Sequence, residues 1–153
     1  IHYAYQLCDI QNREHDKRIC GTDRTLLSKK SLKSFLISVQ NCVEKFTNTR
    51  HTIRIFNDRS TKKLLDFVHN CIEEFSSQNI IIEIEHLKKS GITNSIKQCY
   101  IWMQLNGKDF VYQVQDDYMF TENAIFEMLE LQTQLKIELN EYVLLSIINE
   151  EQL

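Results

Sequence analysis

The chain has 153 residues, of which 42% are hydrophobic, 25% charged and 10% aromatic, and its formal net charge is −3. This composition is typical of a folded globular protein, and a chain of this length is expected to form a single domain over residues 1–153. The lack of excess positive charge argues against a nucleic-acid partner, because such binding depends on Lys and Arg neutralising phosphates. Three Gly and no Pro predict long regular elements rather than the tight hairpins of a β-sandwich.

The sequence also gives expectations about location. No apolar run approaches the roughly 20 residues that cross a bilayer, so no transmembrane segment is expected. The sequence opens at Ile1 with neither a basic leader nor an initiator Met, which suggests a piece of a longer chain. The five cysteines are an odd set without a CxxC pair, which favours buried free thiols over disulfides or metal ligation. Free thiols persist in reducing compartments, so a cytoplasmic location is expected.

The first elements are a strand, a loop and a helix. Apolar and aromatic residues over Ile1–Ile10 predict a strand, and the polar stretch Gln11–Asp23 predicts a loop. Apolar residues three and four apart then predict an amphipathic helix, with Ser28 or Ser31 as its N-cap. The stripe that we expect to be buried consists of Leu32, Phe35, Leu36, Val39, Val43 and Phe46.

The middle of the chain repeats this order. A β-branched run predicts a second strand over His51–Phe56, followed by a polar turn in which Ser60 can cap a helix. The buried stripe of that helix is expected to contain Leu64, Leu65, Val68, Ile72 and Phe75. A second β-branched run predicts a third strand over Ile80–Glu85.

The last third adds two more helices and two more strands. A third helix is predicted over Ile92–Asn106, with Ile96, Cys99, Tyr100 and Met103 facing the core. Gly107 stands where a left-handed C-terminal cap is common. A fourth strand is predicted over Phe110–Val114, a fourth helix is capped by Thr121 with Glu122 in its first turn, and a fifth strand covers Tyr142–Ile148. The buried stripe of the fourth helix is expected to contain Ile125, Met128, Leu129, Gln132 and Leu135.

Strand–helix units of about 30 residues predict a doubly wound α/β fold, a mostly parallel sheet with helices on both faces, because parallel strands need crossover connections. In such sheets ligands bind beyond the carboxyl ends of the strands. Candidate functional residues are therefore those that directly follow each strand.

Two adjacent carboxylates, Asp116 and Asp117, follow the fourth strand. Like charges this close repel each other, and a divalent metal is their natural partner. Carboxylate oxygens suit Mg²⁺ or Mn²⁺, which leave coordination positions free for water and substrate phosphates. The alternative is that the pair opens a turn and caps the following helix, where Asp is common.

Polar residues also follow the other predicted strands. Asp9 lies at the end of the first strand and Asp58 follows the second. The segment from Gly91 to Asn94 follows the third, and its small residues suit close approach of a ligand to a helix N-terminus. Four polar strand ends at one edge of a sheet favour a binding site over a series of unrelated turns.

These residues, taken in order, resemble a GT-A fold glycosyltransferase of the family-2-like type. The resemblance covers nearly the whole chain. It is carried by Arg24, the Ser-Leu-x-Ser-Phe helix at Ser31–Phe35, Asn57-Asp58-x-Ser-Thr, Gly91-x-x-Asn94 and Val114-Gln115-Asp116-Asp117-Tyr118. It implies a Rossmann-like nucleotide-sugar-binding domain, a nucleoside-diphospho-sugar donor, uridine-based in this interpretation, Mn²⁺ or Mg²⁺ as cofactor, and a saccharide or other acceptor.

The resemblance also implies residue roles. Asp58 would contact the nucleotide base, Asp116 the ribose or sugar, and Asp117 would be the metal ligand of the motif called DxD. Asp9, Arg24 and Asn94 would belong to the nucleotide-sugar site. Gln115 and Asn57 replace carboxylates that are usual in the family, and each exchanges an anion for a neutral amide.

Two other interpretations remain. One is a non-catalytic α/β module that binds a nucleotide-sugar or a protein partner. It is favoured by Gln115 and Asn57, and by the expectation that the acceptor site and the catalytic base lie beyond Leu153. The other is a phospho-receiver domain, which is disfavoured because no Asp follows the third strand.

Overall fold

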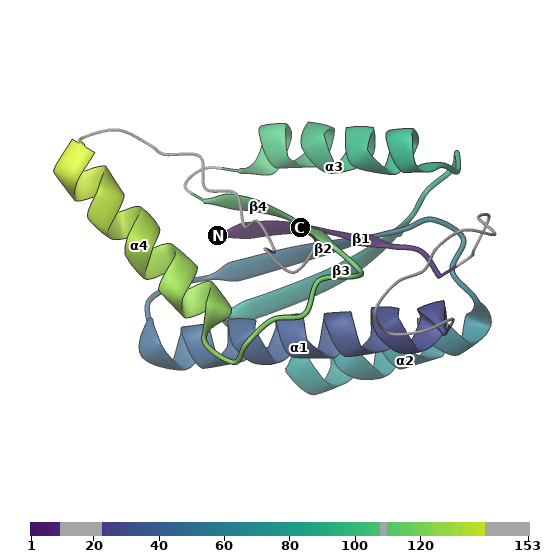
Figure 1. The fold of residues 1–153 in the computed structure, drawn as a ribbon, viewed down its shortest axis with the longest axis horizontal. Coiled ribbons are helices and arrows are strands. Elements are labelled where there is room, and N and C mark those ends of the chain that lie inside the picture. The colour runs from purple at the N-terminus through teal and green to yellow at the C-terminus, as the bar shows by residue number, and fades with distance from the viewer. Residues whose placement is uncertain (10–22, 108–109, 140–153) are drawn as a thin grey trace, which may run out of the picture.

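The computed structural model describes residues 1–9, 23–107 and 110–139. Within these residues strands and helices alternate strictly (Figure 1). The elements are β1 His2–Leu7, α1 Arg24–Lys45, β2 His51–Asn57, α2 Lys62–Phe75, β3 Ile80–His86, α3 Ile92–Asn106, β4 Val111–Gln115 and α4 Ala124–Leu139.

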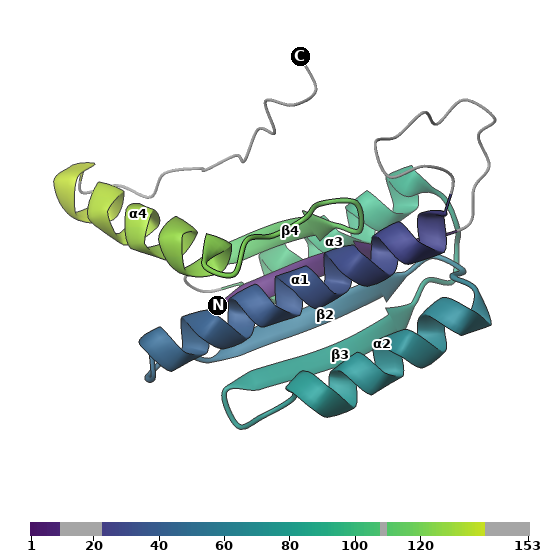
Figure 2. The same ribbon diagram turned by 60° about the horizontal axis from the view of Figure 1, so that its bottom comes forward.

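The strands form one parallel sheet in the order β3-β2-β1-β4. Helices α1 and α2 lie on one face of this sheet and α3 lies on the other, while α4 packs against α1 (Figures 1 and 2). The predicted doubly wound, Rossmann-like α/β fold is therefore confirmed. Because all four strands run in the same direction, their carboxyl ends lie at one edge of the sheet.

The core follows from the alternation of side chains along β1. Tyr3, Tyr5 and Leu7 are buried in the main cluster beneath α1, whereas Ala4 packs with residues of α3 on the opposite face. Phe35 of α1 contacts both tyrosines, with ring centroids 5.3 and 5.5 Å apart. Burying a large apolar side chain contributes about 1.5–3 kcal/mol, so this central strand and helix supply much of the stability.

A buried histidine joins the start of β2 to the core. His51 is fully buried, with its Nδ1 atom 2.9 Å from the Tyr3 hydroxyl and its Nε2 atom 2.9 Å from Thr49 Oγ1. Thr49 donates its own hydroxyl proton to the Phe46 carbonyl oxygen, so Nε2 carries the histidine proton and Nδ1 accepts from Tyr3. Desolvation by burial lowers the pKa of His51 to about 4. The His51 imidazole is therefore neutral in the folded protein at neutral pH.

Helix α1 begins earlier than the sequence indicates. Asp23, not Ser28 or Ser31, is the N-cap and accepts a hydrogen bond from the Leu26 amide. Arg24, which precedes both predicted caps, is the first helical residue. Both serines are instead buried inside the helix, so the polar residues that looked like caps are internal contacts.

Four serines of α1 contact the segment that runs from the end of β4 to the start of α4. Their side chains recur every three or four residues and so lie along one stripe of the helix. The contacts are Ser28 Oγ to Asp116 Oδ2 at 2.9 Å, Ser31 Oγ to Gln115 O at 3.5 Å, Phe120 N to Ser34 Oγ at 3.1 Å and Ile125 N to Ser38 Oγ at 3.0 Å. We refer to these four side chains as the serine stripe.

Several predicted details of α3 and α4 are wrong. Gly107 has φ −72° and is not left-handed, but an added Cβ would lie 2.6 Å from the Met103 carbonyl oxygen, so glycine is required there by close approach. Tyr100 is 59% exposed, because α3 buries the line formed by Ser95, Cys99 and Met103. Helix α4 begins at Ala124, so Glu122 precedes the helix.

The remaining expectations have mixed outcomes. Cys42, Cys71 and Cys99 are free and buried, as predicted, and burial raises their pKa values to about 11, 11 and 12. Within the described residues no helix is long and apolar enough to cross a membrane. The predicted fifth strand, Tyr142–Ile148, and most of the first loop lie outside the described residues.

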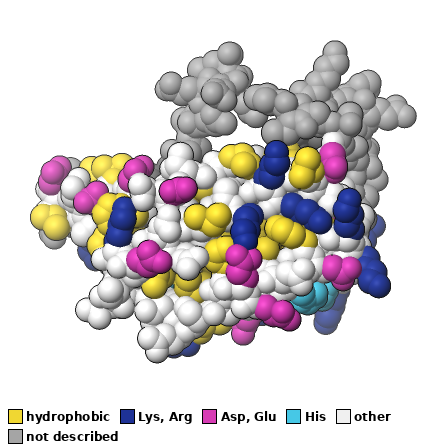
Figure 3. Space-filling view, turned by 90° about the horizontal axis from the view of Figure 1, so that it is seen from below, with side chains coloured by type: hydrophobic (Ala, Val, Ile, Leu, Met, Phe, Trp, Pro, Cys, Tyr) yellow, Lys and Arg dark blue, Asp and Glu magenta, His cyan; other side chains and the backbone are white. Residues whose placement is uncertain are grey.

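The outer surface of α1 and α2 carries side chains of both charges, interspersed with apolar ones (Figure 3). Lys33 pairs with Glu74 at 2.6 Å and lies over the Phe75 ring, and Lys29 lies over the Phe67 ring. Lysine stems therefore cover part of the apolar surface of these helices, as long basic side chains often do.

Candidate functional site at the carboxyl ends of the strands

The predicted acidic residues gather at the edge of the sheet where β1, β2 and β4 end. Asp9 follows β1, Asp58 directly follows β2, and Asp116 and Asp117 directly follow β4. A direct contact joins two of these ends, because the Cys8 amide after β1 donates to Asp116 Oδ2 at 2.8 Å. The sequence-based expectation that strand ends would bring these residues to one edge is therefore met.

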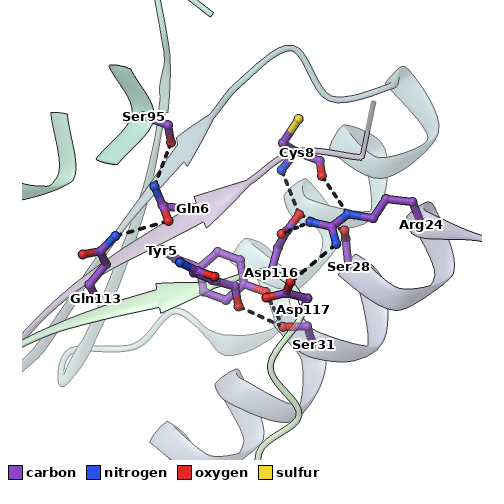
Figure 4. Close-up of polar contacts among 11 residues, drawn as sticks. Tyr5, Gln6, Cys8, Arg24, Ser28, Ser31, Ser95, Gln113, Asp116 and Asp117 are labelled. Atoms are coloured by element: carbon purple, nitrogen blue, oxygen red, sulfur yellow. Dashed lines mark hydrogen bonds and ion pairs between the residues drawn. The ribbon is translucent and has the colours of Figure 1, made fainter. Parts of the chain in front are cut away.

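Asp116 is the buried centre of this edge (Figure 4). Its carboxylate accepts hydrogen bonds from the Cys8 amide, from Ser28 Oγ and from Arg24 Nη2 at 2.5 Å. Burial raises the pKa of Asp116 to about 6, and the Arg24 charge together with these hydrogen bonds opposes that rise. Asp116 thus joins β4, β1 and α1 through bonds within the chain.

Arg24 holds the other side of the carboxylate pair. Its Nε donates to the Cys8 carbonyl oxygen at 3.2 Å and its Nη2 donates to Asp116. Its Nη1 lies 3.7 Å from Asp117 Oδ2, beyond hydrogen-bonding distance, and has no hydrogen-bond acceptor among the described residues. The guanidinium is therefore fixed by two of its nitrogens, with the third directed toward Asp117.

Asp117 is more accessible than Asp116. Its side chain is 23% exposed, compared with 6% for Asp116 and 17% for Arg24. Asp117 is therefore the more exposed carboxylate of this pair. The two adjacent aspartates, which the sequence presents as a pair, occupy different environments.

Asp9 ties two helices to the end of β1. It accepts hydrogen bonds from Thr25 Oγ1 at 2.8 Å in the first turn of α1, and from the Thr61 amide and hydroxyl at the start of α2. Burial alone would raise the pKa of Asp9, but the hydrogen bonds from Thr61 and Thr25 outweigh it and lower the pKa. Thr61, rather than Ser60, is the N-cap of α2.

Asp58 connects the end of β2 to the start of α3. Its Oδ2 accepts from the Gly91 amide at 2.8 Å, and Gly91 adopts φ +111°, a conformation that favours glycine. Its Oδ1 lies 3.4 Å from Arg59 Nε and has no hydrogen-bond partner among the described residues. Asp58 therefore retains one buried acceptor atom.

Asn94 has a local contact rather than a contact with the acidic residues. Its Nδ2 donates to the Lys89 carbonyl oxygen at 2.6 Å and so closes the loop before α3. On the face of the sheet that α3 covers, Gln113 Nε2 donates to Gln6 Oε1, and Gln6 Nε2 donates to Ser95 Oγ (Figure 4). This amide chain anchors the first turn of α3 over β1 and β4.

Sequence reasoning missed the serine and threonine partners of the acids. Ser28 lies one helical turn after Arg24, so both side chains reach Asp116 from the same face of α1. The available signal was a series of small hydroxyl residues within an otherwise apolar helical face. We interpreted Ser28 and Ser31 as caps, which favoured a later helix start.

The donor set fits a metal ion shared with a ligand better than a metal held by protein alone. No group of three His, Cys, Asp or Glu side chains that could hold a metal occurs among residues 1–9, 23–107 and 110–139. Mg²⁺ is commonly bound by one or two carboxylates plus substrate phosphates and water, and Asp117 can supply one such carboxylate. Its neighbour Asp116 is already occupied by three donors.

Family models, curated proteins and solved structures were compared with this chain, and none of them matches it. The class that the structure defines is a Rossmann-like α/β domain with an acidic site at the carboxyl ends of its strands.

Proposed function

We propose that this chain binds a nucleoside-diphospho-sugar together with Mn²⁺ or Mg²⁺ at the carboxyl-end edge of its sheet, as a glycosyltransferase does. The observation that carries the proposal is the convergence of Asp58, Asp116 and Asp117 at that edge, with Arg24 beside the last two. In open α/β sheets this edge is where ligands bind.

Each of these groups has a chemical task in this proposal. Asp117 would hold the metal, which supplies charge neutralisation for the diphosphate leaving group. Arg24 Nη1 would donate to a phosphate oxygen, since this nitrogen has no acceptor in the described part of the chain. Asp58 Oδ1 would accept an N–H group of the nucleobase. Asp116 and Asp9 would hold these groups in place through the hydrogen bonds described above.

The first test is ligand-induced stabilisation. At a ligand concentration of 100 Kd, uridine diphosphate with Mn²⁺ should add about 2.7 kcal/mol, or roughly 5–10 °C in Tm for a domain of this size. Asp117→Asn should remove the part of the shift that depends on Mn²⁺. Asp66→Asn, on the exposed face of α2, is the matched control and should keep it. Absence of a shift with nucleoside diphosphates and either metal would refute the proposal.

A non-catalytic nucleotide-sugar-binding module is the second candidate. The supporting observation is that Asp116 is engaged by Arg24, Ser28 and the Cys8 amide, which leaves Asp117 as the accessible carboxylate of the pair. Release of uridine diphosphate from uridine diphospho-sugars separates the two functions. Turnover would support the transferase, whereas stabilisation without turnover would support the module.

A further inference from the structure

We propose that Arg24 makes metal binding at Asp117 depend on the diphosphate. The inference rests on the proposed function for the identity of the ligand, and it extends that function to the order in which metal and nucleotide bind. Its structural basis is the contact between the Arg24 guanidinium and Asp117, 3.7 Å apart, next to the buried pair of Arg24 with Asp116.

In the ligand-free protein, the guanidinium occupies the position of a counter-ion for Asp117. A free divalent cation would have to bind beside a fixed positive charge, and the two cations repel each other. Arg24 cannot move away easily, because its Nε and Nη2 are held by the Cys8 carbonyl and by Asp116. Arg24 therefore weakens the binding of metal alone.

A diphosphate reverses this effect. Its oxygens offer an acceptor to Arg24 Nη1, which has no hydrogen-bond acceptor among the described residues, and they supply ligands to the metal. With the negative phosphate between them, the guanidinium and the metal both gain an opposite charge. The metal then enters with the nucleotide, and each ligand raises the affinity for the other by the same factor.

The prediction is that one substitution changes two affinities in opposite directions. Arg24→Gln should bind Mn²⁺ alone about tenfold more tightly than the wild type, because a repelling charge at short range is removed. The same variant should bind uridine diphosphate in saturating Mn²⁺ about tenfold more weakly, because it loses a charged donor to phosphate. If Arg24 only supported the fold, its substitution would weaken both affinities.

Two further variants keep the experiment decisive. Arg24→Gln combined with Asp116→Asn neutralises both members of the buried pair, which is tolerated better than removal of one member. It should fold if the single variant does not, and it should show the same two changes relative to Asp116→Asn alone, because that comparison isolates the charge of Arg24. Arg54→Gln removes the same charge from β2, where Arg54 pairs with Glu83, and should change neither affinity more than twofold.

Binding is measured by isothermal titration calorimetry and by electron paramagnetic resonance of free Mn²⁺, with folding checked by circular dichroism. Opposite changes in the folded Arg24 variants support the inference. Changes in the same direction, or none, overturn it while leaving the proposed function intact if the wild type binds uridine diphosphate with Mn²⁺. Failure of the wild type to bind that combination overturns the proposed function and this inference with it.

Discussion

Asp116 and Asp117 are adjacent in the sequence, yet substitution of the two should have different effects on stability. Asp116→Ala leaves the Cys8 amide, Ser28 Oγ and Arg24 Nη2 without their acceptor, in a site where the Asp116 side chain is 6% exposed. Removing one partner of a buried ion pair costs about 3–5 kcal/mol. Asp117→Ala removes an ion pair that is longer, at 3.7 Å, and involves the more exposed carboxylate, so its loss of stability should be clearly smaller than that of Asp116→Ala.

The isosteric Asp116→Asn variant should lose an amount of stability between the losses of these two alanine variants. The pKa of Asp116 is raised to about 6 because burial disfavours its charge, so the ionised carboxylate is itself costly at neutral pH. A neutral amide avoids that cost and keeps one acceptor oxygen, and we expect a loss of about 1–2 kcal/mol.

Urea unfolding followed by circular dichroism at pH 7.5 measures the free energy of unfolding of all three variants. A loss of 3–5 kcal/mol is a large part of the 5–15 kcal/mol typical of a domain, so the difference between the alanine variants should be plain. Equal losses for Asp116→Ala and Asp117→Ala would refute the assignment of a structural role to Asp116 and an accessible role to Asp117. An unchanged m-value confirms that both variants unfold from the same compact state.

Two further substitutions test other parts of the fold. Because the pKa of His51 is lowered from 6.5 to about 4, the unfolded state binds more protons between these values, and wild-type stability should rise with pH there by up to about 3 kcal/mol. His51→Gln should remove that component from the pH profile of urea unfolding, and an unaltered profile would contradict the neutral buried imidazole. Gly91→Ala should cost about 1–2 kcal/mol through its φ of +111° alone, because an added Cβ meets nothing within 4 Å. Unchanged stability of this variant in thermal unfolding would show that the positive φ is not required.

The sheet and its acidic edge could be predicted because they depend on patterns that the chain displays locally. β-branched runs predicted β2 and β3, and three- and four-residue spacing predicted the buried face of α1. Asp58 comes directly after β2, and Asp116 and Asp117 come directly after β4. A parallel sheet brings the ends of these strands to the same edge, so the position of the three acids could be predicted.

The individual roles of the acids could not be predicted, because they depend on contacts between distant segments. Nothing near Asp116 in sequence shows that Arg24 and Ser28, about ninety residues earlier, bind its carboxylate. The same holds for Asp9, whose partner Thr61 lies 52 residues away. The helix start was misjudged for a related reason, since a buried serine and an N-cap serine look alike until their partners are known.

The serine stripe of α1 has a consequence for how the site can move. Its four hydroxyls, taken along the helix, meet Asp116, Gln115, Phe120 and Ile125, so the segment that carries Asp117 runs beside α1 at a fixed register. Rotation of α1 about its axis would break all four contacts together, and a shift of Asp117 alone would strain the nearest two. The helix and the segment after β4 should therefore move as one body when the site responds to a ligand.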